Sequence, residues 1–515
     1  MLGLLLAQVP PTDAVETPDV AWSGLMPLII LSAGAILLLT VMAVAKDALP
    51  RWFSPIYTAL VGIGTIVAAV PLWIRVQDLP DRGPFATLAS AYGIDGFSVF
   101  VTMLLGAVVV MVALLADDYL RREALDGPEF YVLVMISAAG GIVMASANDL
   151  ILLFLGLEVL SIAVYVLAAI NLRRIQSQEA GMKYFVLGAL SSAVFLYGIA
   201  LTYGATGSTN LVEISEFVST TAILDDALLL AGFALLLVGF GFKVAAVPFH
   251  NWTPDVYEGA PTPVVSFMAS AVKTAAFAGM LRVFYVTFGD FRTDWQPIVY
   301  ALAVATLLAG SFMAIVQTDV KRMLAYSSIS HAGYLLVGVQ AATSEGTASV
   351  LFYLAAYSFM VVGSFAVLTL VSGPGDNHTS LDDLSGLART RPALALALTV
   401  FLLGQAGVPF TSGFFAKFYV IGAAVDARSF GLAIVAMLAA VVAAYLYLRI
   451  MMSVWLDGDE PDDPTALAAA RAAIPVPWGA ALVLFITVGF TVVFGIWPQP
   501  IVEMARDAIP VLTQG

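Results

Sequence analysis

Cysteine is absent from the 515 residues of this chain, and histidine occurs only at His250, His331 and His378. Without cysteine, the chain can form no disulfide and offers no thiolate ligands to an iron–sulfur cluster. No predicted helix carries two histidines, which argues against a haem held by a histidine pair. We therefore expect no cofactor and no metal in this chain, and any associated redox chemistry to take place on another polypeptide.

Charged residues are also scarce. They make up 11% of the chain, against 61% hydrophobic residues, and the mean hydropathy is +0.95. Soluble domains contain about 25% charged and 45–50% apolar residues. The apolar runs are about twenty residues long without alternation, which is the length of a membrane helix, whereas a barrel shows alternating segments of about ten residues. The sequence predicts an all-α polytopic membrane protein.

Several functional signatures are missing as well. No glycine-rich phosphate loop, metal-ligand cluster or nucleophile–base arrangement is apparent, and no basic stripe for nucleic acid is present. The net charge of −14 comes largely from acids in loops, such as Asp376–Asp383 and Asp457–Asp463, which we expect to be solvated. Met1–Val9 is apolar but lacks the basic start of a signal peptide, so we expect a short tail before the first span.

Apolar runs separated by charged, proline or glycine breaks predict about fourteen spans. This divides the chain into a tail (1–24), three N-terminal helices (25–129), a first repeat of five helices (130–287), a second repeat (295–456) and a last helix with a short tail (474–515). The predicted starts of the spans are Leu25, Ile56, Gly96, Phe130, Asp149, Gly181, Leu224, Thr262, Trp295, Arg322, Thr347, Pro392, Phe430 and Ile474.

Basic residues favour an orientation with both termini outside, because lysine and arginine accumulate in inner loops. With the N-terminus outside, the inner segments hold Lys46, Arg51, Arg121, Arg122, Arg173, Arg174, Lys321, Arg322, Arg389, Arg391 and Arg471. The outer segments hold the smaller set Arg75, Arg82, Arg282, Arg292, Arg428 and Arg506.

Two pairs of short strings indicate an internal repeat. Asn148-Asp149-Leu150 opens the fifth span and Thr318-Asp319-Val320 opens the tenth. Val247-Pro248-Phe249 interrupts the seventh span and Val408-Pro409-Phe410 the twelfth. Each pair is five spans apart, an odd number, so the two units lie in opposite orientations. Interrupted helices at matching positions point to a transporter-type pathway at the midplane.

The segment Gly241–Pro263 joins a buried cation to a helix break. Lys243 lies in an apolar run that Pro248 interrupts, His250 follows the break, and Lys273 lies within the next run. A lysine at the centre of a membrane helix costs about 2.5–3.5 kcal/mol on insertion scales. Desolvation weakens proton binding by a lysine, so such residues can exchange protons near neutrality. We expect Lys243 to lie beside backbone carbonyls freed by the proline; the alternative is that each lysine only pairs with an acid for assembly.

An acid and a third cation lie on the preceding helices. Glu158 interrupts the apolar stretch Leu150–Ile170, and Lys183 lies near the start of the sixth span. A carboxylate at such a depth is protonated, paired or hydrated. We predict that Lys183 pairs with Glu158. The alternatives are a helix–helix hydrogen bond from Glu158 that stabilises packing, and a Lys183 side chain that reaches to the membrane surface.

The second repeat has its own candidates. His331 lies in a hydroxyl-rich span, Ser327–Tyr334, and histidine titrates near neutrality. Lys417 follows Pro409 in a region where Gly404, Gly407 and Gly413 permit unwinding. We predict that both residues carry protons. A neutral, hydrogen-bonded core histidine is the alternative for His331.

These residues lie in two long strings that resemble a known family. Residues 243–263 read K-V-A-A-V-P-F-H-N-W-T-P-D-V-Y-E-G-A-P-T-P, and residues 319–334 read D-V-K-R-M-L-A-Y-S-S-I-S-H-A-G-Y. They are similar to the signatures of the antiporter-like subunits of proton-pumping NADH:quinone oxidoreductase, respiratory complex I. Lys417 stands where one subunit type has glutamate, and the chain has no room for another type's long lateral helix. It most resembles subunit N, the homologue of mitochondrial subunit 2.

The resemblance implies a redox-driven proton channel in the membrane arm, whose relay residues are carried over by motif. They are Glu158 on the fifth span, Lys243 on the seventh, Lys273 on the eighth, His331 on the tenth and Lys417 on the twelfth, whereas no distinctive string marks Lys183. The implied partners are other membrane-arm subunits and lipids, with quinone and NADH bound by other subunits, in a bacterial plasma membrane.

Two rival functions stay open at this point. The multisubunit sodium/proton antiporters share both motifs, so the chain could belong to an antiporter without an attached dehydrogenase. A scaffold with vestigial charges is the other possibility.

Overall fold

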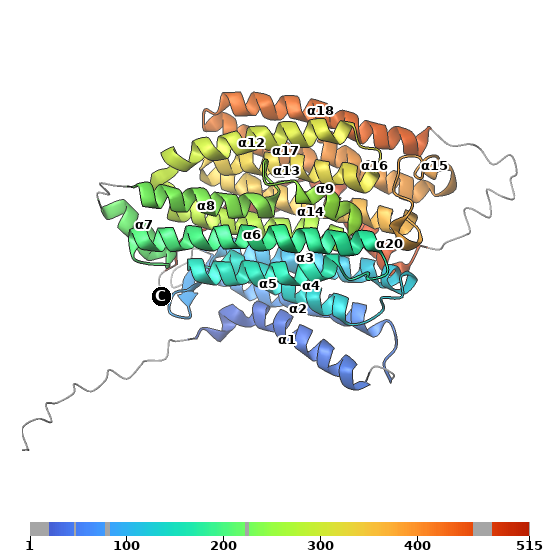
Figure 1. Cartoon of the computed structure of the whole chain (residues 1–515), viewed down its shortest axis with the longest axis horizontal. Coiled ribbons are helices and arrows are strands. Elements are labelled where there is room, and N and C mark those ends of the chain that lie inside the picture. Colours follow the sequence, from blue (N-terminus) through green and yellow to red (C-terminus); the bar gives the residue numbers. More distant parts are fainter. Residues whose placement is uncertain (1–19, 46–47, 78–82, 222–225, 457–475, 514–515) are drawn as a thin grey trace, which may run out of the picture.

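The computed structural model of the chain describes residues 20–45, 48–77, 83–221, 226–456 and 476–513. Its helices lie side by side along one common direction, with α7 (Leu211–Thr220) and the C-terminus at one end and α15 (Leu387–Thr390) at the other (Figure 1). Met1–Val9, Leu224, Asp457–Asp463 and Ile474, for which the sequence made predictions, lie outside the described residues.

Most of the described chain forms long apolar helices. In chain order these are α1 (Trp22–Ala45), α2 (Phe53–Val76), α3 (Gly96–Arg122), α4 (Glu129–Ser146), α5 (Leu150–Ala168), α6 (Ile175–Thr206), α8 (Ala227–Val244) with α9 (Trp252–Gly259), the continuous run α10 (Thr262–Phe267), η2 (Met268–Val272), α11 (Lys273–Met280) and η3 (Leu281–Thr287), then α12 (Arg292–Ile315), α13 (Val320–Ala341), α14 (Ser344–Val371), α16 (Pro392–Ala406) with α17 (Ser412–Asp426), α18 (Phe430–Trp455) and α20 (Trp478–Ile496). A short amphipathic helix, α21 (Gln499–Asp507), follows, and β1 (Phe85–Thr87) and β2 (Tyr92–Ile94) form a small antiparallel hairpin before α3.

The number of spans agrees with the prediction. Within the described residues, 12 helices are long and apolar enough to cross a membrane. Two further spans bring the number to fourteen: α13, which is rich in hydroxyl groups, and the interrupted pair α16 and α17. The largest difference in a described start is at the sixth span, which begins at Ile175 rather than Gly181.

Both predicted helix breaks are present. The helix α8 ends at Val244, and Ala245 adopts a left-handed conformation with φ +63°, so the helix stops before Pro248 is reached. In the twelfth span, Gly407 (φ +87°) and Phe410 (φ +66°) turn the chain between α16 and α17. Positive φ is accessible to glycine without strain. A side chain on Gly413 would collide with the carbonyl oxygen of Gly404, so the two halves of this span meet closely.

The two repeats share a distinctive connection. Asp149 caps α5 and accepts a hydrogen bond from Thr209 (2.7 Å), while Asp319 caps α13 and accepts one from Thr379. The backbone pairs in the same way at both places, through the bridges Asp149–Asn210 and Asp319–Ser380. Corresponding residues are 170 positions apart in every case. The same connection thus occurs at two places five spans apart, which supports the inverted repeat. The residue bounds of the two repeats stay a prediction.

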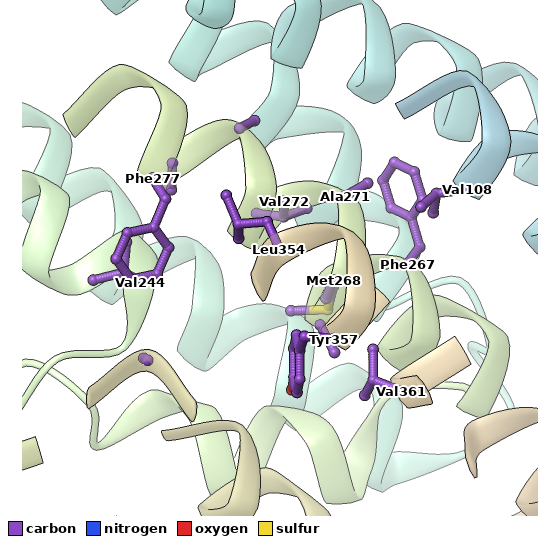
Figure 2. Packing of buried hydrophobic residues seen from close by; sticks show 14 of the residues in the cluster. Val108, Val244, Phe267, Met268, Ala271, Val272, Phe277, Leu354, Tyr357 and Val361 are labelled. Carbon is purple, nitrogen blue, oxygen red and sulfur yellow. The ribbon is translucent and has the colours of Figure 1, made fainter. Parts of the chain in front are cut away.

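The eighth span forms the centre of the bundle. Every residue in the most apolar 18-residue stretch of this span is buried, and 89% of the residues in the corresponding stretch of α14 are buried. Figure 2 shows Ala271 and Val272 of η2 packed among Leu354 and Tyr357 of α14, with Val108 of α3 nearby. Burial of these apolar side chains fixes the polar residue Lys273, which directly follows Val272, within the core.

The end of the bundle that carries the C-terminal segment is held by a buried ion pair. Arg282 of η3 contacts Asp95 at 2.6 Å, and neither side chain is exposed. Arg282 also donates to the carbonyl of Ala145 (2.6 Å), and the amide of Val511 donates to Asp95 (3.0 Å). The C-terminal segment is thus tied to the start of α3. The prediction that Arg282 is one of the charges of the outer segments was therefore wrong, because its side chain is buried inside the bundle.

The opposite end of the bundle is organised around Asp376. Its carboxylate accepts hydrogen bonds from Thr262 (2.9 Å) and Tyr119 (3.1 Å) and lies 3.2 Å from Lys321. Burial alone would raise the pKa of Asp376, but Lys321, Arg174 and the hydrogen bonds hold it below its usual value. The expectation of a solvated loop acid is therefore wrong for Asp376, which joins α3, α10 and α13.

Candidate functional site

Lys243 lies in an aromatic cage at the end of α8. Its side chain is 3% exposed, and Nζ donates to the hydroxyl of Tyr165 on α5 at 3.0 Å. The same nitrogen lies over the rings of Tyr165 (5.0 Å) and Tyr184 (5.4 Å). Cation–π attraction stabilises an ammonium in such a place. The prediction that freed backbone carbonyls surround Lys243 was wrong, because the helix ends before the proline and the side chain points to α5 and α6.

Glu158 lies two turns before Tyr165 on α5. It interacts electrostatically with both Lys243 and Tyr165. One of its oxygens, Oε1, is buried without a hydrogen-bond partner among the described residues. An unpaired buried carboxylate oxygen is costly unless it is protonated or hydrated. The described residues therefore leave this oxygen of Glu158 without a hydrogen-bond donor.

Lys183 does not pair with Glu158, which corrects the prediction. Its Nζ contacts Glu179 and Asp255, each at 2.7 Å, and 41% of the side chain is exposed. Asp255 also contacts Arg322 of α13 at 3.0 Å. Because α6 begins six residues earlier than predicted, Lys183 sits two turns inside it, facing α9 rather than α5. These charges line a cavity of about 340 Å³ at the end of the bundle that holds Asp376.

His250 lies in the break between α8 and α9. It is partly buried, and its Nδ1 has no hydrogen-bond partner among the described residues. Nearby, Trp252 donates to the carbonyl of Phe242 (3.0 Å) and stacks on Tyr184 at 4.4 Å. The structure therefore separates His250 from the contacts that Lys243 makes, and nothing in the described residues joins it to the other candidates.

Lys273 lies at the centre of the bundle, 3% exposed. Its Nζ donates to both the carbonyl and the hydroxyl oxygen of Ser328 on α13, each at 2.5 Å. It also lies 5.4 Å from the ring centre of Tyr357 on α14. Within the described residues it has no acidic partner. The alternative that Lys273 only pairs with an acid for assembly therefore has no support among the described contacts.

His331 joins three helices. Its Nδ1 is 2.6 Å from the hydroxyl of Tyr353 on α14, and its Nε2 is 3.2 Å from that of Tyr447 on α18. The Tyr447 hydroxyl also bonds Ser327 (2.7 Å), which donates to Gln405 on α16 at 3.3 Å. Histidine and tyrosine hydroxyls can each donate and accept, so this chain of contacts can pass a proton without moving heavy atoms.

Lys417 lies at the break of the twelfth span, 7% exposed. Its Nζ donates to the carbonyl of Ala406 at 2.9 Å and lies 4.9 Å from the ring centre of Tyr334. Ala406 is the last residue of α16, and helix ends leave carbonyls without intrahelical partners. The contact with a helix-end carbonyl that was expected for Lys243 is thus made by Lys417 instead, and the unwound segment predicted beside Lys417 is present.

Three buried hydroxyl groups near the lysines have no hydrogen-bond partner among the described residues. They are Tyr184 OH near Lys243, Tyr357 OH near Lys273, and Ser412 Oγ at the start of α17, the helix of Lys417. Buried polar groups in proteins are satisfied by protein or by ordered water. These hydroxyl groups are therefore places where an ordered water could bind.

The sequence missed most of the hydroxyl groups in this network. Tyr165 is seven residues after Glu158, a helical spacing that could have been noticed. Tyr353, Tyr447 and Gln405 come from three separate helices, and no local pattern marks them. Their role depends on which helix faces surround His331.

Residues 147–443 match the family model described as "NADH:quinone oxidoreductase/Mrp antiporter, TM". A relative from Trichlorobacter lovleyi, named NADH-quinone oxidoreductase subunit N, is 40% identical over 95% of this chain and 97% of its own length.

Among solved structures, a chain of respiratory complex I from Thermus thermophilus with bound aureothin is 34% identical, with a TM-score of 0.73, over 93% of this chain and all of that chain. A chain of the Mrp complex from Dietzia sp. DQ12-45-1b has a TM-score of 0.80 over 95% of this chain and 97% of that chain, at 21% identity. The latter likeness shows the fold alone.

Proposed function

Because the chain belongs to the family of NADH-quinone oxidoreductase subunit N, we propose that it is a proton-translocating membrane-arm subunit of such an enzyme. It is a multi-pass membrane protein that works with the other membrane-arm subunits. NADH and quinone are bound by other subunits, and redox energy released there drives proton movement here. The identity of 40% with a subunit N over nearly the whole chain favours this function over the sodium/proton antiporter.

One observation supports the relay in particular: two groups of buried polar contacts, one at Lys273 and one around His331, lie on α13 on the side of Lys417. Lys273 bonds Ser328 on α13, one turn from His331 on the same helix. His331 contacts Tyr447, Tyr447 contacts Ser327, and Ser327 donates to Gln405 on α16. The last carbonyl of α16 accepts a hydrogen bond from Lys417. Protons would enter near Glu158 and Lys243, pass along this axis and leave near Lys417.

The drive is a change in charge pairing near Glu158. A proton on Glu158 removes the negative charge that stabilises the Lys243 ammonium, so Lys243 releases its proton toward the axis. Moving one charge against 100 mV requires about 2.3 kcal/mol. A tenfold change in proton affinity corresponds to about 1.4 kcal/mol. About two such changes per 100 mV are therefore needed, which closely spaced buried charges can provide.

We place the subunit in a bacterial plasma membrane with both termini outside. An even number of spans puts the start of α1 and the end of α20 on one side. Basic residues gather at the other end, where Arg122, Arg174, Lys321 and Arg322 surround Asp376 and Asp255. This distribution agrees with the rule that inner segments are basic.

The test replaces Glu158→Gln, Lys243→Ala and Lys417→Ala together in the assembled enzyme. We expect fewer protons per electron during NADH oxidation in inverted vesicles. The control is Arg449→Met, which removes a cation of α18 whose hydrogen bonds within the described residues go to the carbonyls of Ile315 and Gln317. An unchanged proton-to-electron ratio in the triple variant would refute the relay and favour the scaffold. Recovery of the chain without NADH-oxidising and iron–sulfur subunits would favour the antiporter.

A further inference from the structure

A cavity at the inner end of the bundle lies apart from the relay. Its volume is about 260 Å³, and it is enclosed by the start of α2, the end of α3, the end of α14 and the start of α20. Gly479 permits this arrangement, because a Cβ there would lie 2.6 Å from the carbonyl oxygen of Leu114. The close approach of α20 to α3 forms the floor of the cavity.

The polar part of the lining carries both signs of charge. Arg121 is already paired with Asp117 at 2.7 Å. Arg51 and Asp118 also line the cavity, and both are exposed without a hydrogen-bond or ion-pair partner among the residues that the structure describes. Among the described residues, the lining therefore offers one unpaired cation and one unpaired anion, and its charges sum to zero.

The rest of the lining fixes the depth of the cavity in the membrane. Leu114, Leu115 and Leu370 form a buried apolar wall. Trp52 and Trp478 stand at the rim, 53% and 59% exposed. Tryptophan gathers at the boundary between headgroups and acyl chains. The free charges thus lie at headgroup level and the leucines at the level of the first acyl carbons.

We propose that this cavity binds a phospholipid with a zwitterionic aminoethyl phosphate headgroup, the phosphatidylethanolamine class. The phosphate contacts Arg51, the ammonium contacts Asp118, and the chains begin along the leucine wall. A purely anionic headgroup is disfavoured because Asp118 has no cation to neutralise it. A trimethylated headgroup keeps its charge but has no N–H to donate to Asp118. The site is independent of the proton relay.

The test measures the lipids retained by the purified enzyme after incorporation into nanodiscs with equal amounts of phosphatidylethanolamine, phosphatidylcholine and phosphatidylglycerol. After a detergent wash, retained lipids are counted by mass spectrometry. We expect Arg51→Ala to lower retention of one phosphatidylethanolamine about tenfold, since a charge-assisted hydrogen bond is lost. Arg51→Lys keeps the cation and restores retention. Asp118→Asn removes the preference over phosphatidylcholine.

The matched control is Arg292→Ala, which removes an exposed arginine from the start of α12 at the opposite end of the bundle and leaves retention unchanged. The proposal is overturned if Arg51→Ala and Arg292→Ala behave alike, or if phosphatidylglycerol is the retained lipid. It is also overturned if a cryo-electron microscopy map of the wild-type enzyme shows side chains of a neighbouring subunit in the cavity. Proton pumping is not the readout, so failure here leaves the proposed function untouched.

Discussion

Tyr447 offers a sharp test of the central relay. Its hydroxyl lies 2.7 Å from Ser327 Oγ and 3.2 Å from His331 Nε2, and the residue is 1% exposed. Tyr447→Phe removes this oxygen and keeps the ring. The substitution interrupts the contacts between His331 and the polar groups beside the twelfth span without altering any charge.

The expected magnitudes differ greatly for stability and for proton transfer. Two hydrogen bonds are lost, each with a net value of about 0.5–1.5 kcal/mol, so the free energy of unfolding falls by about 1–3 kcal/mol. The subunit should still fold and assemble, because domains are stable by about 5–15 kcal/mol. A positioned proton-transfer group typically contributes a factor of about 10²–10⁴. Transfer through His331 should therefore slow by about a hundredfold or more.

The assay is the number of protons pumped per electron in inverted vesicles, measured with the rate of NADH oxidation and the amount of assembled enzyme. Tyr57→Phe is the matched control, because its hydroxyl donates to the carbonyl of Gly34 at 3.1 Å, between α1 and α2. We expect a lower ratio for Tyr447→Phe and a normal one for Tyr57→Phe. Equal, normal ratios in both variants would show that the Tyr447 hydroxyl is not on the pathway.

Two further substitutions test the framework. Gly413→Ala should reduce both proton pumping and stability, because the added Cβ would collide with Gly404 and push α16 away from α17 beside Lys417. The control is Gly422→Ala on the same helix, which should change neither, because no atom lies within 4 Å of the added Cβ. Asp376→Asn should lower the free energy of unfolding by about 3–5 kcal/mol, since it leaves buried cations unpaired. In the folded wild-type protein the pKa of Asp376 is held below its usual value, so its carboxylate is charged throughout the range from pH 5 to 8. The difference in melting temperature between the wild-type protein and Asp376→Asn should therefore be constant from pH 5 to 8 and disappear only in stronger acid. A pH-dependent advantage within that window would contradict the pairing.

Span number and the two helix breaks were predictable because they depend on local chemistry. Twenty apolar residues in lipid must form a helix, and glycine or proline interrupts it. The lysines were equally visible, since a cation within such a run stands out. The partner of Lys183 was not predictable, because Asp255 is 72 residues away and reaches it only when α9 folds back against α6.

The sequence by itself determined that the chain spans the membrane, where its helices break, and which buried residues could carry protons. Only the tertiary structure decided what those residues touch. Arg282 and Asp376 appeared to be loop charges, yet packing places them inside the two ends of the bundle. The contacts of His331 with Tyr353 and Tyr447 likewise form only because α13, α14 and α18 turn polar side chains toward one another. The hydropathy of consecutive residues determines where a helix spans the membrane. Hydrogen bonds between helices depend instead on how each helix is rotated about its axis in the bundle.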